Sequence, residues 1–252
     1  MKMTAAQLAR LTAEFRRDGY VIARRFVDSQ QIRQLLDQID RYLQQLPALP
    51  PEAAFYEDKS NLESLKRLDQ LSKDDYFRNL LDHGPWVALV EQLLGQPIIP
   101  QSIALFGNPP LIGRDTPPHQ DGEYYLIEPN EAAMVWLALD EVDEENGCVR
   151  YIPGSHRQGL REHAISGTLG FSLGVVGYGP DAVAREVPTC MEPGDIIVHH
   201  SLTIHRADGN RSQRRRWGLG CEYRGKHVKE DTARRQAHVE RMKQVWADEA
   251  RI

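Results

Sequence analysis

Apolar residues recur at helical spacing through the first part of the chain. From Ile32 to Leu46 they fall mostly three or four residues apart, which predicts an amphipathic helix with one buried face. Asp28 precedes this run, and Gln31 stands three positions after it, which is the pattern of a capping box. The proline-rich stretch that begins at Pro47 is expected to end the helix.

Shorter helical patterns lie on both sides of this helix. A stripe of apolar residues over 8–15 ends near Gly19, and the apolar residues 20–22 that follow predict a brief strand. Gly95 and Pro97 are expected to end the helical part of the chain. Further helices are predicted over residues 61–71, 74–82 and 86–94 and, close to the C-terminal end, over 229–250.

From Ile98 onward the pattern changes to short apolar or alternating runs, which are separated by stretches rich in Gly, Pro, Asn and Asp. This spacing is typical of an antiparallel sandwich or barrel. The connections 107–118 and 156–182 are too long for tight hairpins, and we expect them to be active-site loops. Strands are predicted over residues 98–106, 133–139, 149–152, 195–199 and 217–223.

These elements predict one domain over residues 1–252 with a mainly β, α+β fold. A helical layer over about residues 1–96 packs on a β core over about 97–225, and the C-terminal helix follows. The segments 144–147 and 153–156 are expected to be structural turns. We expect the protein to be a monomer or a homodimer.

Composition limits the classes of function. Of the 252 residues, 41% are hydrophobic and 27% charged, as in an ordinary globular protein. No apolar run approaches the roughly 20 residues of a membrane span, and the first residues lack the apolar core of a signal peptide. The formal net charge of −5 gives no field that attracts polyanions, so we expect no membrane and no nucleic acid as partner.

The three cysteines, Cys148, Cys190 and Cys221, are scattered along the chain. Their spacing fits neither a disulfide framework nor a thiolate zinc site. We therefore expect small buried residues in a reducing compartment, and a cytoplasmic protein.

Candidate chemistry begins with His119-Gln120-Asp121. In an extended segment, residues two apart project from the same face, so this imidazole and this carboxylate can converge. Together they supply two-thirds of the facial triad that holds non-haem Fe(II). The missing ligand is expected to be a histidine from a distant strand. His199, His200 and His205 compete for that position; the first two point to opposite faces of a strand, and spacing alone does not rank the three.

A run of arginines follows these histidines. Its bland interpretation is a solvated basic patch, because no aromatic stacking platform accompanies it and the chain is acidic. A more specific hypothesis is that one arginine points into the barrel as a two-pronged donor for a carboxylate. The run consists of Arg206, Arg211, Arg214, Arg215 and Arg216.

In combination these motifs resemble the phytanoyl-CoA dioxygenase family, whose members are Fe(II)- and 2-oxoglutarate-dependent oxygenases. The resemblance extends over about residues 15–225 and is densest from 117 to 217. It implies a double-stranded β-helix, a jelly-roll of the cupin-like kind, with N-terminal helices. It rests on the H-x-D motif, on 145–148 running into 153–156, and on His205 with the segment 210–216.

The resemblance also implies roles for individual residues. His119, Asp121 and His205 are the implied iron ligands, and Arg216 is the implied clamp for the distal carboxylate of 2-oxoglutarate. The arginine stands eleven residues after His205, which favours His205 over its two competitors. O₂ is the implied second cosubstrate. The other residues implied at the cosubstrate are Trp136, Gln120, Gln101, Ile103 and, from a poorly aligned region, Lys66.

Two positions depart from the family pattern or narrow its chemistry. Ala207 stands where many members have a hydroxyl that contacts the cosubstrate, and the adjacent Asp208 would repel the 2-oxoglutarate anion. Members that halogenate replace the acidic ligand with a small residue, so the retained Asp121 favours hydroxylation or a related C–H oxidation.

The leading hypothesis is an oxygenase that acts on a small-molecule metabolite and releases succinate and CO₂. The alternatives are a catalytically silent cupin-like binding domain and an oxygen-independent metal-dependent isomerase or hydrolase on the same barrel. Arg114, Tyr124 and Tyr125 are candidates for the entrance of the site, where they suit a polar or zwitterionic substrate.

Overall fold

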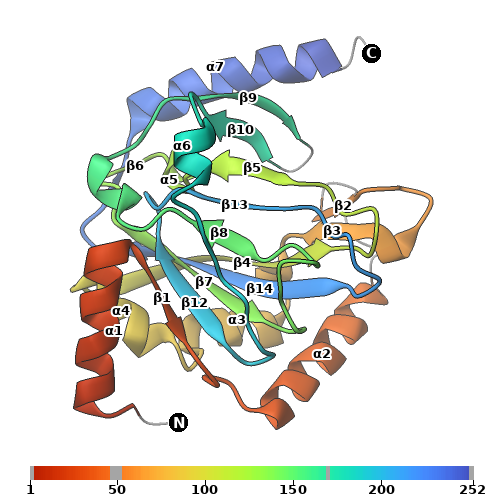
Figure 1. Cartoon of the computed structure of the whole chain (residues 1–252), viewed down its shortest axis with the longest axis vertical. Helices are drawn as coiled ribbons and strands as arrows, with labels where there is room; N and C mark the ends of the chain where they lie inside the picture. The colour runs from red at the N-terminus through yellow and green to blue at the C-terminus, as the bar shows by residue number, and fades with distance from the viewer. Residues whose placement is uncertain (1–2, 46–52, 169–170, 250–252) are drawn as a thin grey trace.

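The computed structural model describes residues 3–45, 53–168 and 171–249 (Figure 1). Two antiparallel sheets form a double-stranded β-helix. The larger sheet has the strand order β1-β12-β7-β14-β4-β3-β2. Its strands are β1 (Tyr20–Ala23), β2 (Ala54–Tyr56), β3 (Leu65–Leu68), β4 (Ile98–Asn108), β7 (Ala132–Ala138), β12 (Ile196–His200) and β14 (Arg216–Gly225).

The smaller sheet has the order β11-β8-β13-β5. Two further strand pairs, β9 with β10 and β6 with β15, complete the β structure, and β9 and β10 lie against β5. The strands of the smaller sheet are β5 (Thr116–His119), β8 (Val149–Tyr151), β11 (Val187–Pro188) and β13 (His205–Ala207). Those of the two pairs are β6 (Ile127–Glu128), β9 (His163–Thr168), β10 (Phe171–Val175) and β15 (Lys229–Glu230).

The N-terminal helices lie on the side of the larger sheet that faces away from the smaller one (Figure 1). The main apolar core lies between these helices and the larger sheet. Leu105 and Leu219 of the sheet belong there to the same buried cluster as Phe77 and Trp86 of the helical layer. The interior between the two sheets is therefore left for the site. The α-helices are α1 (Ala5–Asp18), α2 (Ser29–Leu43), α3 (Asp75–His83), α4 (Val87–Leu94), α5 (Gly122–Tyr125), α6 (Pro180–Val183) and α7 (Thr232–Glu249).

Local sequence signals explain the ends of these helices. The capping box predicted at Asp28 is confirmed, because its carboxylate accepts from the backbone of Gln31 and the Gln31 side chain accepts from the backbone of Asp28. Gly19 ends α1 with φ of 81°, a left-handed conformation that glycine adopts without strain. Helix α2 ends at Leu43, and the prolines expected to stop it lie outside the described residues.

The five predicted strands of the core are present as β4, β7, β8, β12 and β14. The predicted helix over 61–71 is wrong. One 3-10 turn spans Leu62–Ser64, and then β3 pairs with β4, placing Leu68 opposite Leu105. Pairing with a strand far along the chain decides this segment, and that partner leaves no local signal.

The two long connections also contain more regular structure than predicted. The connection 107–118 ends in β5, and 156–182 contains β9 and β10. The C-terminal helix begins at Thr232 instead of at 229, because the two residues of β15 pair with β6 first. Short strands of this kind form only where a partner edge is available.

Cys148 and Cys221 are buried as predicted, whereas Cys190 is exposed, and all three are free thiols. Within the described part of the chain, none of the helices combines the length and the apolar character that a bilayer crossing requires.

Candidate functional site

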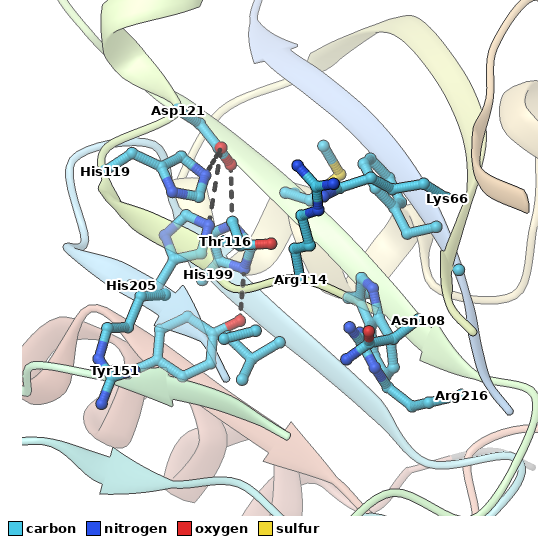
Figure 2. A pocket seen from close by; sticks show the side chains of 17 residues that line it. Lys66, Asn108, Arg114, Thr116, His119, Asp121, Tyr151, His199, His205 and Arg216 are labelled. Atoms are coloured by element: carbon cyan, nitrogen blue, oxygen red, sulfur yellow. Dashed lines mark hydrogen bonds and ion pairs between the residues drawn. The ribbon is translucent and has the colours of Figure 1, made fainter. Parts of the chain in front are cut away.

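Three donor groups meet between the sheets at the paired strands β5 and β13. His119 ends β5, His205 begins β13 directly opposite it, and Asp121 follows β5 by two residues. The Nε2 atoms of His119 and His205 lie 3.6 and 3.7 Å from Oδ1 of Asp121. All three donor atoms lie within 4.8 Å of one another, a spacing that suits one metal ion (Figure 2).

The backbone fixes which nitrogen of each imidazole faces the group. Nδ1 of His119 lies 2.8 Å from the carbonyl of Pro117, and Nδ1 of His205 lies 3.0 Å from that of Thr203. A carbonyl oxygen only accepts, so each Nδ1 carries the hydrogen. The lone pairs of both Nε2 atoms then face a shared centre, as in metal-binding histidines generally.

A third imidazole, that of His199 on β12, lies next to this group. Its Nε2 is 2.8 Å from Oδ2 of Asp121, and its Nδ1 is 2.9 Å from the hydroxyl of Tyr151. A carboxylate cannot donate, so Nε2 of His199 donates to Asp121, while Nδ1 on the other side of the ring shares a hydrogen bond with the hydroxyl of Tyr151. The hydroxyl of Tyr125 donates to the same Oδ2 at 3.3 Å. Oδ1 therefore remains for the shared centre.

His200 points away from the site. Its ring contacts those of Phe15 and His156 instead. Geometry therefore distinguishes the three histidines. His205 offers a donor atom to the group with His119 and Asp121, His199 donates to the other carboxylate oxygen of Asp121, and His200 does neither.

Electrostatics keep the group ready for a cation. Burial alone would raise the pKa of Asp121, but His205, His119 and His199 outweigh it and hold that pKa well below its ordinary value. Burial, together with His119, lowers the pKa of His205 well below 6.5. At neutral pH the carboxylate is therefore ionised and His205 is neutral, which are the forms that bind metal.

A cavity of about 680 Å³ extends from these donors to Arg216 (Figure 2). Arg216 begins β14 and is 6% exposed, and its guanidinium carbon lies 5.6 Å from the ring centre of Trp136. Burial lowers its pKa to about 10. Its Nε has no hydrogen-bond partner, and the guanidinium forms no ion pair with any described residue. A buried cation of this kind calls for an anionic ligand.

Arg206 is half-buried and lines the same cavity, but Glu186 and Asp208 neutralise its guanidinium. The remaining arginines of the run, apart from Arg216, are exposed. Arg214 pairs with Glu141 and Asp143, and Arg215 lies 3.9 Å over the ring of Trp217. Of the run, Arg216 alone is buried, as the inward-arginine hypothesis predicted.

The comparisons with known proteins now bear on this geometry. Residues 15–218 match the phytanoyl-CoA dioxygenase family. This chain belongs to the phytanoyl-CoA dioxygenase family. Peroxisomal phytanoyl-CoA dioxygenase of Rattus norvegicus is 32% identical over 145 residues, which cover 54% of this chain and 42% of that protein. Phytanoyl-CoA dioxygenase domain-containing protein 1 of Mus musculus is 32% identical over 149 residues, covering 57% and 50%. The chain thus spans about half the length of these relatives.

Solved structures share the fold. The epimerase SnoN, crystallised with Fe³⁺, alpha ketoglutarate and nogalamycin RO, superposes with a TM-score of 0.73 at 23% identity, over 90% of this chain and 87% of that one. EctD from S. alaskensis with bound Fe gives 0.71 at 22%, over 89% and 79%. The carbocyclase SnoK gives 0.74 at 20%, over 95% and 91%.

The family resemblance placed two residues of β4 at the cosubstrate, but Ile103 lies on the opposite face of the strand and Gln101 lies at an irregularity in the pairing of β4 with β14. Side chains alternate along a strand, so Ala104 and Phe106 line the interior between the sheets. Ile103 instead packs in the helix-covered core at 1% exposure. The side chain of Gln101 bonds to the carbonyls of Ile99 and Pro100, and neither residue lines a cavity described for the site.

Gln120 is fully buried but turned away from the metal donors. Its amide nitrogen donates to the carbonyls of Gly159 and Leu202, and its oxygen accepts from the backbone of Arg161. It therefore holds the segment between the two donors in place, and it lines neither cavity. Trp136, in contrast, lines the same cavity as Arg216.

The remaining candidates divide between structure and cavity. Lys66 lines the cavity, but its ammonium is paired at 2.6 Å with the buried carboxylate of Glu57, which Arg114 also contacts. Ala207 lines the cavity as well. The carboxylate of Asp208 pairs with two arginines, Arg150 and Arg206, and lies outside the lining, so it is neutralised and does not oppose an anion there.

Sequence reasoning missed His199 as a partner of the carboxylate, with Tyr151 bonded to the other side of its ring, and it missed the inward face of β14. Spacing gives no signal for the first, because the contact joins separate strands. The inward face of β14 could have been predicted, because Arg216, Glu222 and Arg224 are separated by even numbers of residues on a single apolar strand.

Proposed function

We propose that this protein is an Fe(II)- and 2-oxoglutarate-dependent oxygenase that hydroxylates, or otherwise oxidises, a C–H bond of a small molecule. The observation that carries the proposal is Arg216, a buried guanidinium without a counter-ion among the described residues, in one cavity with a His-Asp-His donor group. A dicarboxylic keto acid fits that arrangement, with one end at the donors and the distal carboxylate at the arginine.

In this proposal His119, Asp121 and His205 hold the iron. Bound iron supplies the binding of O₂ and the oxidation of the C–H bond, with release of succinate and CO₂. Arg216 orients the cosubstrate by a charge-assisted pair, and Trp136 packs beside that guanidinium at 5.6 Å. The cavity keeps these charges partly out of water, which strengthens the attraction between the guanidinium and a bound carboxylate.

Two other classes of function use less of this geometry. A silent binding domain has no need of three donors with aligned lone pairs, and an oxygen-independent isomerase or hydrolase gives Arg216 no task. Similar structures include an epimerase and a carbocyclase, so related folds serve several outcomes. We favour hydroxylation because Asp121 is a carboxylate, which occupies the space that a halide needs.

The decisive experiment uses the purified full chain. Anaerobic calorimetry should detect 2-oxoglutarate binding only after Fe(II) is added, and aerobic incubation with ascorbate should release succinate. Asp121→Ala and His205→Ala should abolish both signals, whereas His83→Gln, an exposed histidine at the end of α3, should retain them. Normal metal binding and succinate release in both site variants would refute the proposal.

A further inference from the structure

A second cavity, of about 730 Å³, begins at the same metal donors and extends away from Arg216. It shares His119, Asp121, Phe106 and Met134 with the first cavity. Its lining comes mainly from β4, β14 and the short helix α5: Arg67, Ser102, Ala104, Phe106, Tyr124, Tyr125, Met134, Gly220, Glu222 and Arg224.

Strand β14 supplies one carboxylate and one guanidinium of this lining, Glu222 and Arg224. Arg216 and Arg224 stand eight residues apart on its inward face, roughly 25 Å along the strand. One small ligand cannot reach both guanidinium groups across that distance. Arg216 therefore belongs to the cosubstrate side of the donors, and Arg224 with Glu222 belongs to the other side, where a substrate has to lie.

Glu222 and Arg224 form an ion pair at the end of this cavity that lies away from Arg216. Nε of Arg224 donates to Oε1 of Glu222 at 3.0 Å, and the hydroxyl of Ser102 donates to Oε2 at 3.1 Å. The Glu222 side chain is 10% exposed and that of Arg224 is 22% exposed. The terminal nitrogens of Arg224 have no hydrogen-bond partner among the described residues, so they remain available to a ligand.

Arg224 is also connected to the metal donors. Its guanidinium carbon lies 5.7 Å from the ring centre of Tyr125, whose hydroxyl donates to Asp121. A group bound by Arg224 therefore lies one aromatic ring away from the metal donors, close enough to place another carbon of the same small molecule beside them.

The charges of the lining balance. The lining holds two guanidinium groups, Arg67 and Arg224, and two carboxylates, Asp121 and Glu222. Arg224 pairs with Glu222, and Arg67 pairs at 2.8 Å with Asp69, which lies outside the lining. Burial raises the pKa of Glu222, and Arg224 opposes this, so the carboxylate gains from a second cation nearby. A ligand with a net charge would lose its hydration without compensation, whereas a ligand with one charge of each sign finds a partner for both.

Given the proposed function, on which this inference rests, we infer that the substrate is a small zwitterion. Its carboxylate binds the free fork of Arg224, and its cationic nitrogen binds the remaining lone pairs of Glu222. The C–H bond to be oxidised then lies toward His119 and Asp121.

The test measures succinate release by the full chain with Fe(II), 2-oxoglutarate and a panel of free amino acids. Each amino acid is compared with its N-acetyl derivative, which is an anion, and with its methyl ester, which is a cation. We expect at least one zwitterion to stimulate succinate release, with kcat/KM about tenfold to a hundredfold above both derivatives, the size of a lost charged contact. Equal activity of a derivative, or no response to any zwitterion, overturns the inference.

Two variants separate the partners. Glu222→Gln should raise the KM for the zwitterion about tenfold or more and reduce discrimination against the N-acetyl derivative. Arg224→Gln should also raise the KM for the zwitterion about tenfold or more, and it should reduce discrimination against the methyl ester. Both should leave the KM for the cosubstrate unchanged, as should Arg78→Gln, an exposed arginine on α3 that should also keep the KM for the zwitterion. Unchanged discrimination in both cavity variants overturns the inference.

Failure here is distinguishable from failure of the proposed function. If Fe(II)-dependent binding of 2-oxoglutarate is absent, the proposed function fails and this inference falls with it. If that binding is intact and zwitterions are not preferred, the inference about substrate class alone is wrong.

Discussion

Nε2 of His199 donates a 2.8 Å hydrogen bond to Oδ2 of Asp121, and this contact determines which carboxylate oxygen is left for a metal ion. Tyr125 donates to the same oxygen. Oδ1 faces the imidazoles of His119 and His205. A carboxylate held in this way would bind a metal ion through one oxygen, which would leave other positions open for small molecules.

Replacing His199 should weaken metal binding without removing a ligand. In His199→Leu the Oδ2 atom loses its main donor, and we expect affinity for Fe(II) to fall about tenfold to a hundredfold, as for other groups that orient metal ligands. Tyr151→Phe should have a smaller effect, because Tyr151 acts only through His199. Anaerobic calorimetry measures both values. With His83→Gln as the control, an unchanged affinity in His199→Leu would contradict this role.

Replacing Arg216 should change stability and cosubstrate binding in opposite directions. Without a ligand, Arg216 is a buried charge that lacks an ion-pair partner among the described residues, so Arg216→Met should match or exceed the wild type in free energy of unfolding. With Fe(II) present, a cosubstrate concentration about a hundred times the dissociation constant should stabilise the wild type by about 2.7 kcal/mol. The variant should gain almost nothing. Thermal unfolding with and without cosubstrate checks both expectations, and a variant that is less stable without cosubstrate would count against them.

The sequence was most informative where a signal is local. The capping box at Asp28, the glycine that ends α1 and the apolar core strands all follow from residues that lie close together in the chain. The segment 61–71 failed because its strand depends on pairing with β4. A run of helix-compatible residues does not reveal a partner edge far along the chain.

The same distinction explains the site. The donors His119 and Asp121 are two residues apart, so their proximity was predictable, although β5 ends at His119 and Asp121 already has the backbone angles of a helix. The contact of His199 with Asp121, in contrast, joins β12 to the segment after β5. Ile103 was assigned to the wrong face of β4, because a shift of one residue exchanges the two faces of a strand, and Gln101 lies where the pairing of β4 with β14 is irregular.

Acid should destabilise the metal-free protein through His200. Burial, with His156 and His199 nearby, lowers the pKa of His200 from 6.5 to about 4. Between these values the unfolded chain binds more protons, so the free energy of unfolding falls as the pH falls through that window, by about 3 kcal/mol in total. Asp121 adds nothing there, because its pKa is lowered and its stabilisation is lost only at still lower pH.

Urea unfolding at pH 7, 6 and 5 measures this slope. In His200→Gln, which keeps an acceptor for the backbone of Leu202, the slope should be shallower by the contribution of His200, and the part that His205 contributes should remain. The same slope in both proteins would show that His200 does not titrate in this range.

Gly218 leaves the space that Trp136 occupies beside Arg216, and a single methyl group tests this. A Cβ at position 218 would lie 1.9 Å from Cζ2 of Trp136, so the indole must move. We expect Gly218→Ala to cost about 1–3 kcal/mol of stability. It should also weaken 2-oxoglutarate binding, because the displaced ring no longer supports the guanidinium. Gly179→Ala is the matched control, since its Cβ meets no atom within 4 Å. Chemical unfolding and cosubstrate titration of both variants check the expectation, and equal behaviour of the two would mean that the cavity wall tolerates a displaced Trp136.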